Sequence, residues 1–117
     1  MIALAGPAVE PCRRYKPTMA RTALDTDEVM HRLAEVAGWT LREGKLHREY
    51  KFADFVEAFG FMASAALVAE RMNHHPEWFN VWSTVVVDLT THDAGGITAN
   101  DFALAAEMER LAGARTK

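Results

Sequence analysis

The sequence predicts an α+β fold whose helices and strands follow the order αββαββα. Three stretches repeat apolar residues at the 3.6-residue period of a helix. Two other segments are interpreted as hairpins: residues 39–50, where two short stretches flank a turn-forming segment, and residues 79–91, which are rich in β-branched and aromatic residues. Two hairpins imply an antiparallel sheet, so we expect the helices to gather on one face of that sheet.

Length and composition are typical of a single globular domain. The chain has 117 residues, of which 50% are apolar and 25% are charged. Cys12 is the only cysteine, so an intrachain disulfide is excluded, which fits a reducing compartment. We find neither an apolar run of membrane-helix length nor a signal peptide, and therefore expect a cytoplasmic protein.

The charge balance disfavours two classes of partner. A formal net charge of −3 gives no broad positive field. Such a field would be needed to attract a nucleic-acid backbone or an anionic bilayer. We therefore expect neither nucleic acid nor a membrane as a general partner.

Residues 1–18 are expected to form a flexible extension ahead of a single domain over residues 19–117. This stretch contains three of the four prolines and has no sustained apolar period. An organelle transit peptide and translation from Met19 are the alternatives that remain open.

The first helix is expected to begin after Asp25 and to continue to Gly38. Asp25 and Glu28 form a capping-box pattern, apolar residues then recur at helical spacing to Ala37, and Gly38 is a common helix stop. A hairpin follows, with strands at residues 39–41 and 46–50 around the turn-forming segment 42–45.

The second helix is expected to be capped by Asp54 and to end near Met72. Residues 79–91 are too long for one strand, so we divide them into a second hairpin with Ser83 and Thr84 in its loop. Thr98 and Asp101 have the spacing of a capping box and should start a last helix that continues to about Leu111.

Three of the five histidines, His74, His75 and His92, lie in the two segments that the second hairpin brings together. A two-residue loop at Ser83 and Thr84 would set His75 directly opposite His92 on one face. A three-residue loop centred on Thr84 would shift the pairing by one position and create a fully apolar face instead. Both registers bring the two histidine segments side by side.

Clustered imidazoles point to proton transfer, because imidazole gains and loses protons near neutral pH. Glu70 lies one helical turn before His74 and could orient an imidazole. A structural role for the histidines is the alternative, and it is the one we favour for His31 and His47. A metal site is disfavoured, since no cysteine and no His-x-His spacing accompanies the cluster.

The flanking residues supply groups that could hold a flat polar ligand. Asn73, Thr90, Thr91 and Asp93 add hydrogen-bond donors and acceptors. Trp78 is either a stacking wall of the pocket or part of the core.

The residues from Trp39 to about Ala112 resemble the pterin-4a-carbinolamine dehydratase family. The resemblance rests on the Glu-Arg-Met-Asn-His-His-Pro-Glu-Trp-Phe-Asn-Val run at 70–81, Thr-Thr-His-Asp at 90–93 and Phe-Gly-Phe-Met at 59–62. It implies an αββαββα fold with a four-stranded antiparallel sheet. Some members have Asp in place of Asn73 and Glu in place of Asp93.

The resemblance also implies residue roles. The catalytic residues would be His74, His75 and His92, and the acidic partner would be Glu70. The segments that contain Asn73, Thr90, Thr91 and Asp93 would contact the substrate, and Trp78 is added to this set as a stacking candidate.

The implied activity is that of a lyase without metal or cofactor. It would remove water from 4a-hydroxytetrahydrobiopterin, which aromatic amino acid hydroxylases release, to give quinonoid dihydrobiopterin. A homodimer or homotetramer is expected. The alternative function is that of a protein-binding dimerisation cofactor for a transcription factor, a role that animal relatives also have.

Overall fold

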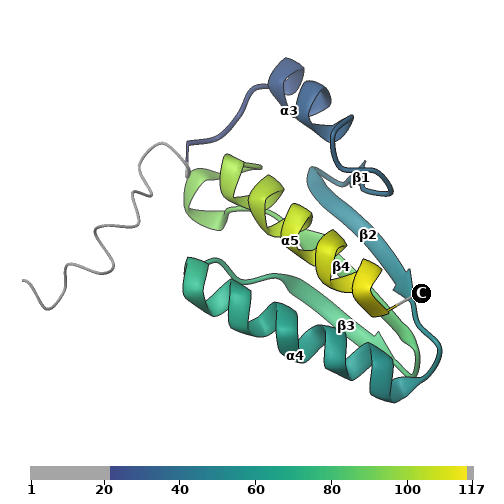
Figure 1. The fold of residues 1–117 in the computed structure, drawn as a ribbon. Helices are drawn as coiled ribbons and strands as arrows, with labels where there is room; N and C mark the ends of the chain where they lie inside the picture. Colours follow the sequence, from purple (N-terminus) through teal and green to yellow (C-terminus); the bar gives the residue numbers. More distant parts are fainter. Residues whose placement is uncertain (1–21, 116–117) are drawn as a thin grey trace, which may run out of the picture.

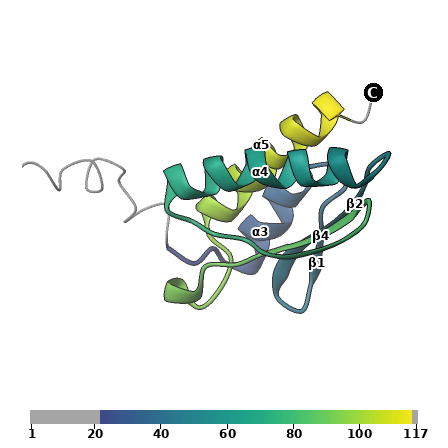
Figure 2. The ribbon, with the colours of Figure 1, turned by 90° about the horizontal axis from the view of Figure 1, so that it is seen from below.

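The structure is a computed structural model that describes residues 22–115 (Figure 1). The extension expected at residues 1–18 lies outside these residues. Three helices, α3 (Thr26–Leu33), α4 (Phe55–Met72) and α5 (Ala99–Arg115), lie on one face of a sheet (Figure 2). The predicted α+β class and the order αββαββα are confirmed.

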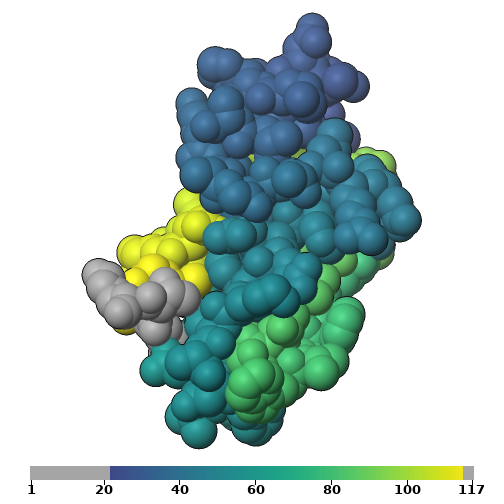
Figure 3. All heavy atoms as spheres, turned by 90° about the vertical axis from the view of Figure 1, so that its right-hand side faces the viewer, coloured from purple at the N-terminus to yellow at the C-terminus, as the bar shows by residue number. Residues whose placement is uncertain are grey.

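The sheet has four antiparallel strands in the order β1-β2-β4-β3. The first hairpin is β1 (Thr40–Arg42) and β2 (Lys45–Lys51), and the second is β3 (Glu77–Val81) and β4 (Thr84–Leu89). Helix α3 lies at one end of the molecule and the turn between β3 and β4 at the other (Figure 3). Among the described residues, no helix has both the length and the apolar character needed to cross a membrane.

The core lies between the sheet and the helices. Val85, Val87 and Leu89 alternate along β4 and are fully buried, as the period of a strand with one covered face requires. They share the core cluster with Phe61 of α4 and Leu104 of α5. Each buried side chain of this size contributes roughly 1.5–3 kcal/mol relative to an exposed one, so the second hairpin is firmly attached to the helices.

The two aspartate caps predicted from sequence are present. Asp25 Oδ1 accepts a hydrogen bond from the Glu28 backbone N–H at 2.9 Å, and Asp54 Oδ1 accepts one from Glu57 at 2.9 Å. Each cap satisfies a backbone donor that the first turn of a helix leaves unpaired.

The predicted end of the first helix is wrong. Helix α3 ends at Leu33, and the chain continues through turns in which Val36 N–H bonds to Leu33 O and Trp39 N–H bonds to Val36 O. Val36 is buried, so the apolar spacing there reflects core packing and not helical structure. Gly38 has a φ of +90°, and Arg48 Cζ lies 2.7 Å from where a Cβ would stand.

The predicted loop of the second hairpin is also wrong. The turn residues are Trp82 and Ser83, and Val81 pairs with Thr84. Both expected registers therefore fail, and His75 is not opposite His92. The side-chain Nδ2 of Asn80 donates to Trp82 O at 3.0 Å and to Thr84 O at 2.9 Å, which holds the turn in this place.

One carboxylate joins the first hairpin to α5. Glu109 Oε2 accepts hydrogen bonds from Trp39 Nε1 at 2.9 Å, Arg48 Nε at 2.8 Å and the Tyr50 hydroxyl at 2.6 Å. The Arg48 guanidinium also lies over the Tyr50 ring, 4.5 Å from its centroid. These contacts hold α5 against the first hairpin.

Candidate active site

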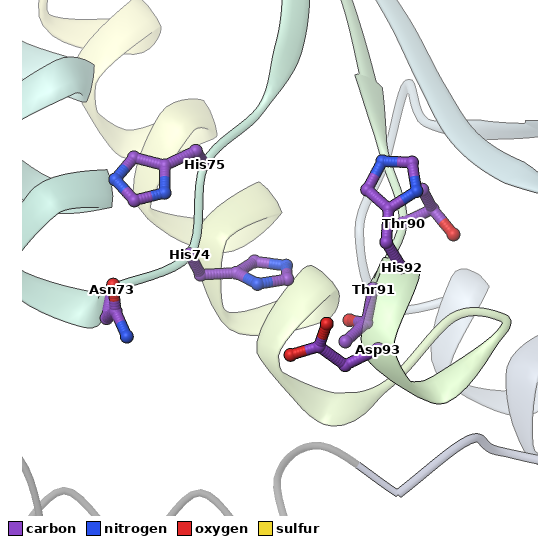
Figure 4. Close-up of a pocket in the computed structure, with 7 residues that line it drawn as sticks. All are labelled: Asn73, His74, His75, Thr90, Thr91, His92 and Asp93. Carbon is purple, nitrogen blue, oxygen red and sulfur yellow. The ribbon is translucent and has the colours of Figure 1, made fainter.

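A pocket of about 360 Å³ opens between the end of α4 and the end of β4. Its lining consists of two short segments, residues 73–75 and residues 90–93 (Figure 4). The structure thus brings together seven of the residues named from sequence: Asn73, His74, His75, Thr90, Thr91, His92 and Asp93.

The first segment begins where α4 ends. Asn73 has a φ of 54°, in the left-handed region that asparagine tolerates better than most residues, and its N–H bonds to Ala69 O and Glu70 O. The chain leaves the helix there and passes through His74 and His75 into β3. The two rings point in different directions: His74 points toward the second segment and His75 toward the end of α4 (Figure 4).

The second segment is a tight turn. Thr91 O accepts the N–H groups of Ala94, Gly95 and Gly96, and residues His92–Ala94 form the 3₁₀ turn η2. Gly95 closes this turn with a φ of 74°. His92 therefore stands on a turn that the backbone itself fixes.

His74 is held by a buried carboxylate. Its Nε2 lies 2.5 Å from Asp101 Oδ1, and both side chains are almost completely buried. Asp101 Oδ2 accepts two further hydrogen bonds, from the Thr91 hydroxyl and from the Thr98 backbone N–H, each at 2.9 Å. Asp101 lies in the first turn of α5, where the helix dipole favours a negative charge.

His75 and His92 have carboxylate partners nearer the surface. His75 Nε2 bonds to Glu70 Oε1 at 2.9 Å, and His92 Nε2 bonds to Glu77 Oε2 at 2.8 Å. Both imidazoles are exposed, unlike His74. The pocket therefore contains one buried and two exposed imidazole–carboxylate pairs.

The pairing determines which nitrogen of each ring can react. An ionised carboxylate only accepts hydrogen bonds, so each imidazole that is bonded to an ionised partner must carry its proton on Nε2. In the neutral ring the lone pair then lies on Nδ1, which can take up a proton and return it. Three such groups around one pocket can act as general acid and general base.

Two residues named from sequence lie outside the lining. Glu70 contacts His75 and not His74, because the left-handed Asn73 turns the chain back toward α4. Trp78 pairs with Val87, so it lies on the helix-covered face of the sheet, where it packs against the core. A stacking role for Trp78 stays a prediction.

Sequence reasoning missed Asp101, Thr98 and Glu77 as members of the site. The sequence did contain a signal for Asp101, because Thr98 and Asp101 have the spacing of a capping box. In such a box one carboxylate oxygen caps the helix, and the other is free to accept from another donor, here His74. Glu77 lies within the 70–81 run, but its contact with His92 could not be predicted, because that contact depends on the turn at η2.

His47 lies on β2, outside the pocket, and a structural role for it stays a prediction. His47 Nδ1 bonds to Asp88 Oδ1 at 2.8 Å, and its Nε2 lies 3.2 Å from Arg42 Nη1. Within residues 22–115, no three side chains of His, Cys, Asp or Glu are grouped so that they could hold a metal ion.

Fold and site together define a class: a small α+β domain with an open pocket lined by three histidines, each bonded to a carboxylate. The chain belongs to the pterin 4 alpha carbinolamine dehydratase family, whose model matches residues 22–111.

Related proteins agree with this membership. A protein of Solibacter usitatus (strain Ellin6076), provisionally named pterin-4-alpha-carbinolamine dehydratase, is 64% identical over 91 residues, which are 78% of this chain and 96% of that protein. A protein of Rhizobium johnstonii with the same provisional name is 53% identical, over 80% of this chain and 95% of its own length.

A solved structure is also similar. The crystal structure of a transcriptional coactivator/pterin dehydratase from Brucella melitensis is 44% identical and superposes with a TM-score of 0.76. The match covers 79% of this chain and 100% of that one.

Proposed function

We propose that this protein is a hydro-lyase that converts 4a-hydroxytetrahydrobiopterin to quinonoid dihydrobiopterin by histidine acid–base catalysis. The observation that carries the proposal is the set of three carboxylate-held imidazoles around one pocket, in a chain that belongs to the pterin carbinolamine dehydratase family. The reaction would serve to recycle tetrahydrobiopterin.

The dehydration needs a general acid that gives a proton to the leaving hydroxyl and a general base that takes a proton from the pterin ring. A protonated imidazole donates to the 4a-hydroxyl, which leaves as water, while a neutral imidazole removes a proton from the ring nitrogen system. No electrons are transferred and no covalent intermediate is needed, so the histidines suffice without metal or cofactor. His74 and His75 would form the proton-transfer pair, and His92 would mainly position the pterin.

The lining suits a small polar ring system. A pocket of about 360 Å³ is at the lower end of the usual range for small-molecule sites, which fits a bicyclic pterin. Asn73, Thr90 and Asp93 would bind the ring heteroatoms, and Thr91 would act through Asp101, to which its hydroxyl is bonded.

A turnover assay tests the proposal. Purified protein should accelerate loss of 4a-hydroxytetrahydropterin above the buffer-only rate, and chelator should not slow it. A His74→Ala/His75→Ala double variant should lose this acceleration, whereas His31→Ala, on helix α3 and outside the pocket lining, should keep it. A rate no faster than buffer would refute the enzyme, and zinc-restored activity after chelation would refute the metal-free mechanism.

We also propose that copies of the chain assemble into a homodimer or homotetramer. Helix α4 presents exposed apolar residues to solvent, among them Phe55, Val56, Phe59 and Leu67. Strand β3 is an edge strand with no lysine or proline to protect it from pairing. Both surfaces suit a second copy. An aromatic amino acid hydroxylase would be a functional partner, as the source of the carbinolamine.

The same α4 surface favours a second candidate function, the binding of another protein. The Brucella melitensis structure is described as a transcriptional coactivator as well as a dehydratase. The two functions separate experimentally, because substitution of the histidines would remove catalysis and substitution on α4 would remove partner binding.

A further inference from the structure

Glu77 connects the pocket to the open face of the sheet. It is the first residue of β3 and lies on the face that the helices leave uncovered, together with Asp88, with which it pairs. Its two carboxylate oxygens have different partners: Oε1 accepts from Lys45 Nζ at 2.7 Å and Oε2 from His92 Nε2 at 2.8 Å.

Lys45, Glu77 and His92 come from separate parts of the fold. Lys45 begins β2, Glu77 begins β3, and β4 lies between these strands. Neighbouring strands are about 4.8 Å apart, so the long Lys45 side chain has to reach across β4. His92 lies just after the end of β4. The ion pair between Lys45 and Glu77 therefore crosses the sheet at the end where residues 90–93 leave β4.

Lys45 stabilises the ionised form of Glu77 and holds the carboxylate in place. The hydrogen bond from Lys45 is the largest cause that holds the pKa of the Glu77 carboxyl below its usual range, and the bond from His92 adds to it. In return, Glu77 raises the pKa of the Lys45 ammonium, with smaller contributions from Asp88 and Glu43. An ionised carboxylate accepts at both oxygens, so His92 must present its Nε2 proton to it.

We propose that Glu77, anchored by Lys45, is a positioning residue that fixes the tautomer and ring orientation of His92 at the pterin pocket. His92 needs such a contact, because its side chain is 76% exposed and stands on a turn, so packing alone restricts the ring little. With Nε2 taken by Glu77, the Nδ1 edge of the ring is left for a ligand. The role of this contact in substrate binding rests on the proposed function.

The first test observes His92 directly. The protein is labelled with ¹⁵N-histidine and studied by NMR at mildly alkaline pH, where an ordinary imidazole is neutral. The ¹⁵N signals of the two ring nitrogens then report the tautomer. The signals of His92 are assigned by their loss in His92→Gln. Glu77→Gln and Lys45→Met should both shift the His92 signals toward a tautomer mixture. Lys45→Arg should restore the wild-type signals, because it keeps the cation.

The matched control is Lys51→Met. Lys51 is on the same strand as Lys45 and pairs with Glu49 at 3.1 Å, away from the pocket residues. It should leave the His92 signals unchanged. Lys45 is a surface side chain, so Lys45→Met keeps the test available if Glu77→Gln fails to fold.

The second test is kinetic. Glu77→Gln and Lys45→Met should raise KM for 4a-hydroxytetrahydropterin by about two- to fivefold, the range expected for an exposed ion pair, with a smaller change in kcat. Lys45→Arg and Lys51→Met should not.

The two tests distinguish this proposal from the proposed function. Unchanged His92 signals in either Glu77→Gln or Lys45→Met would overturn the positioning role, whatever the activity. If the His92 signals shift in the two variants but the wild-type protein shows no turnover, the positioning role of Glu77 is supported and the dehydratase activity is refuted.

Discussion

At the scale of residues, the three pocket imidazoles differ most in their exposure to water. The His74 side chain is 4% exposed, whereas those of His75 and His92 are 58% and 76% exposed. A buried pair keeps its geometry, while an exposed pair exchanges contacts with solvent and is worth little in stability. The histidines should therefore contribute differently to catalysis.

Single substitutions by alanine should separate these contributions. His74→Ala or His75→Ala should lower kcat by about 100- to 10,000-fold, the usual contribution of general acid–base catalysis. His92→Ala should raise KM at least as much as it lowers kcat if, as we propose, His92 mainly positions the pterin. Steady-state kinetics, corrected for the spontaneous rate at the same pH, measure both constants. Wild-type constants in all three variants would mean that the cluster is structural.

Asp101→Asn should lower kcat by more than any loss of folding stability can explain. The amide keeps an acceptor for Thr98 N–H but loses the charge that holds His74, so we expect kcat to fall by at least about tenfold. Melting temperature and kcat are measured together. Asp54→Asn is the control, since it also changes a helix-capping carboxylate but lies outside the pocket. Equal losses of kcat in the two variants would contradict a role for Asp101 in the site.

The sequence predicted the pocket residues better than their partners. His74, His75 and His92 stand out because they are clustered in short motifs, and all three line the pocket. Asp101 is 27 residues from His74 and Glu77 is 15 residues from His92, so only the tertiary structure shows that these pairs are in contact. The three-residue spacing of Thr98 and Asp101 identifies Asp101 as a helix cap. It cannot show that the other carboxylate oxygen of Asp101 contacts His74.

At the scale of elements, the helix starts and the end of α4 at Met72 were predicted well, whereas the end of α3 and the turn of the second hairpin were not. A cap is a contact over three residues, so Asp25 and Asp54 are visible in the sequence. The turn at Trp82 and Ser83 depends instead on the Asn80 side chain and on a positive φ of 51° at Trp82, which is a residue that sequence rules do not place there.

The Glu109 cluster gives this fold a pH dependence at its alkaline end. Burial and the hydrogen bond to Glu109 raise the pKa of Tyr50 far above its usual value. Above about pH 10 the unfolded chain loses the tyrosine proton while the folded chain keeps it. The free energy of unfolding should therefore fall as the pH rises through this range.

Urea unfolding at a series of alkaline pH values tests this dependence. Tyr50→Phe should be less stable than wild type at neutral pH by about 1 kcal/mol, because it loses one hydrogen bond. Its stability should also fall less steeply above about pH 10. Parallel stability curves for the two proteins would show that Tyr50 does not cause the alkaline loss.

At the scale of the whole molecule, the uncovered surfaces are as informative as the pocket. The exposed apolar residues of α4 recur at helical spacing on the side turned away from the sheet. Phe79, Val81 and Trp82 are exposed on β3 and its turn. Apolar residues gathered in this way on a small domain mark surfaces that bind protein.

If α4 joins copies of the chain, one charge on it should break the assembly. Light scattering should show wild type at a multiple of the 13.0 kDa chain mass. Leu67→Glu should shift the mass toward the monomer, because a carboxylate buried in an apolar interface has no partner. Met30→Glu makes the same kind of change on α3, where Met30 is also exposed, and should leave the mass unchanged. Wild type at 13.0 kDa would refute the assembly, and an intact oligomer in Leu67→Glu would place the interface elsewhere, with the β3 edge as the surface to test next.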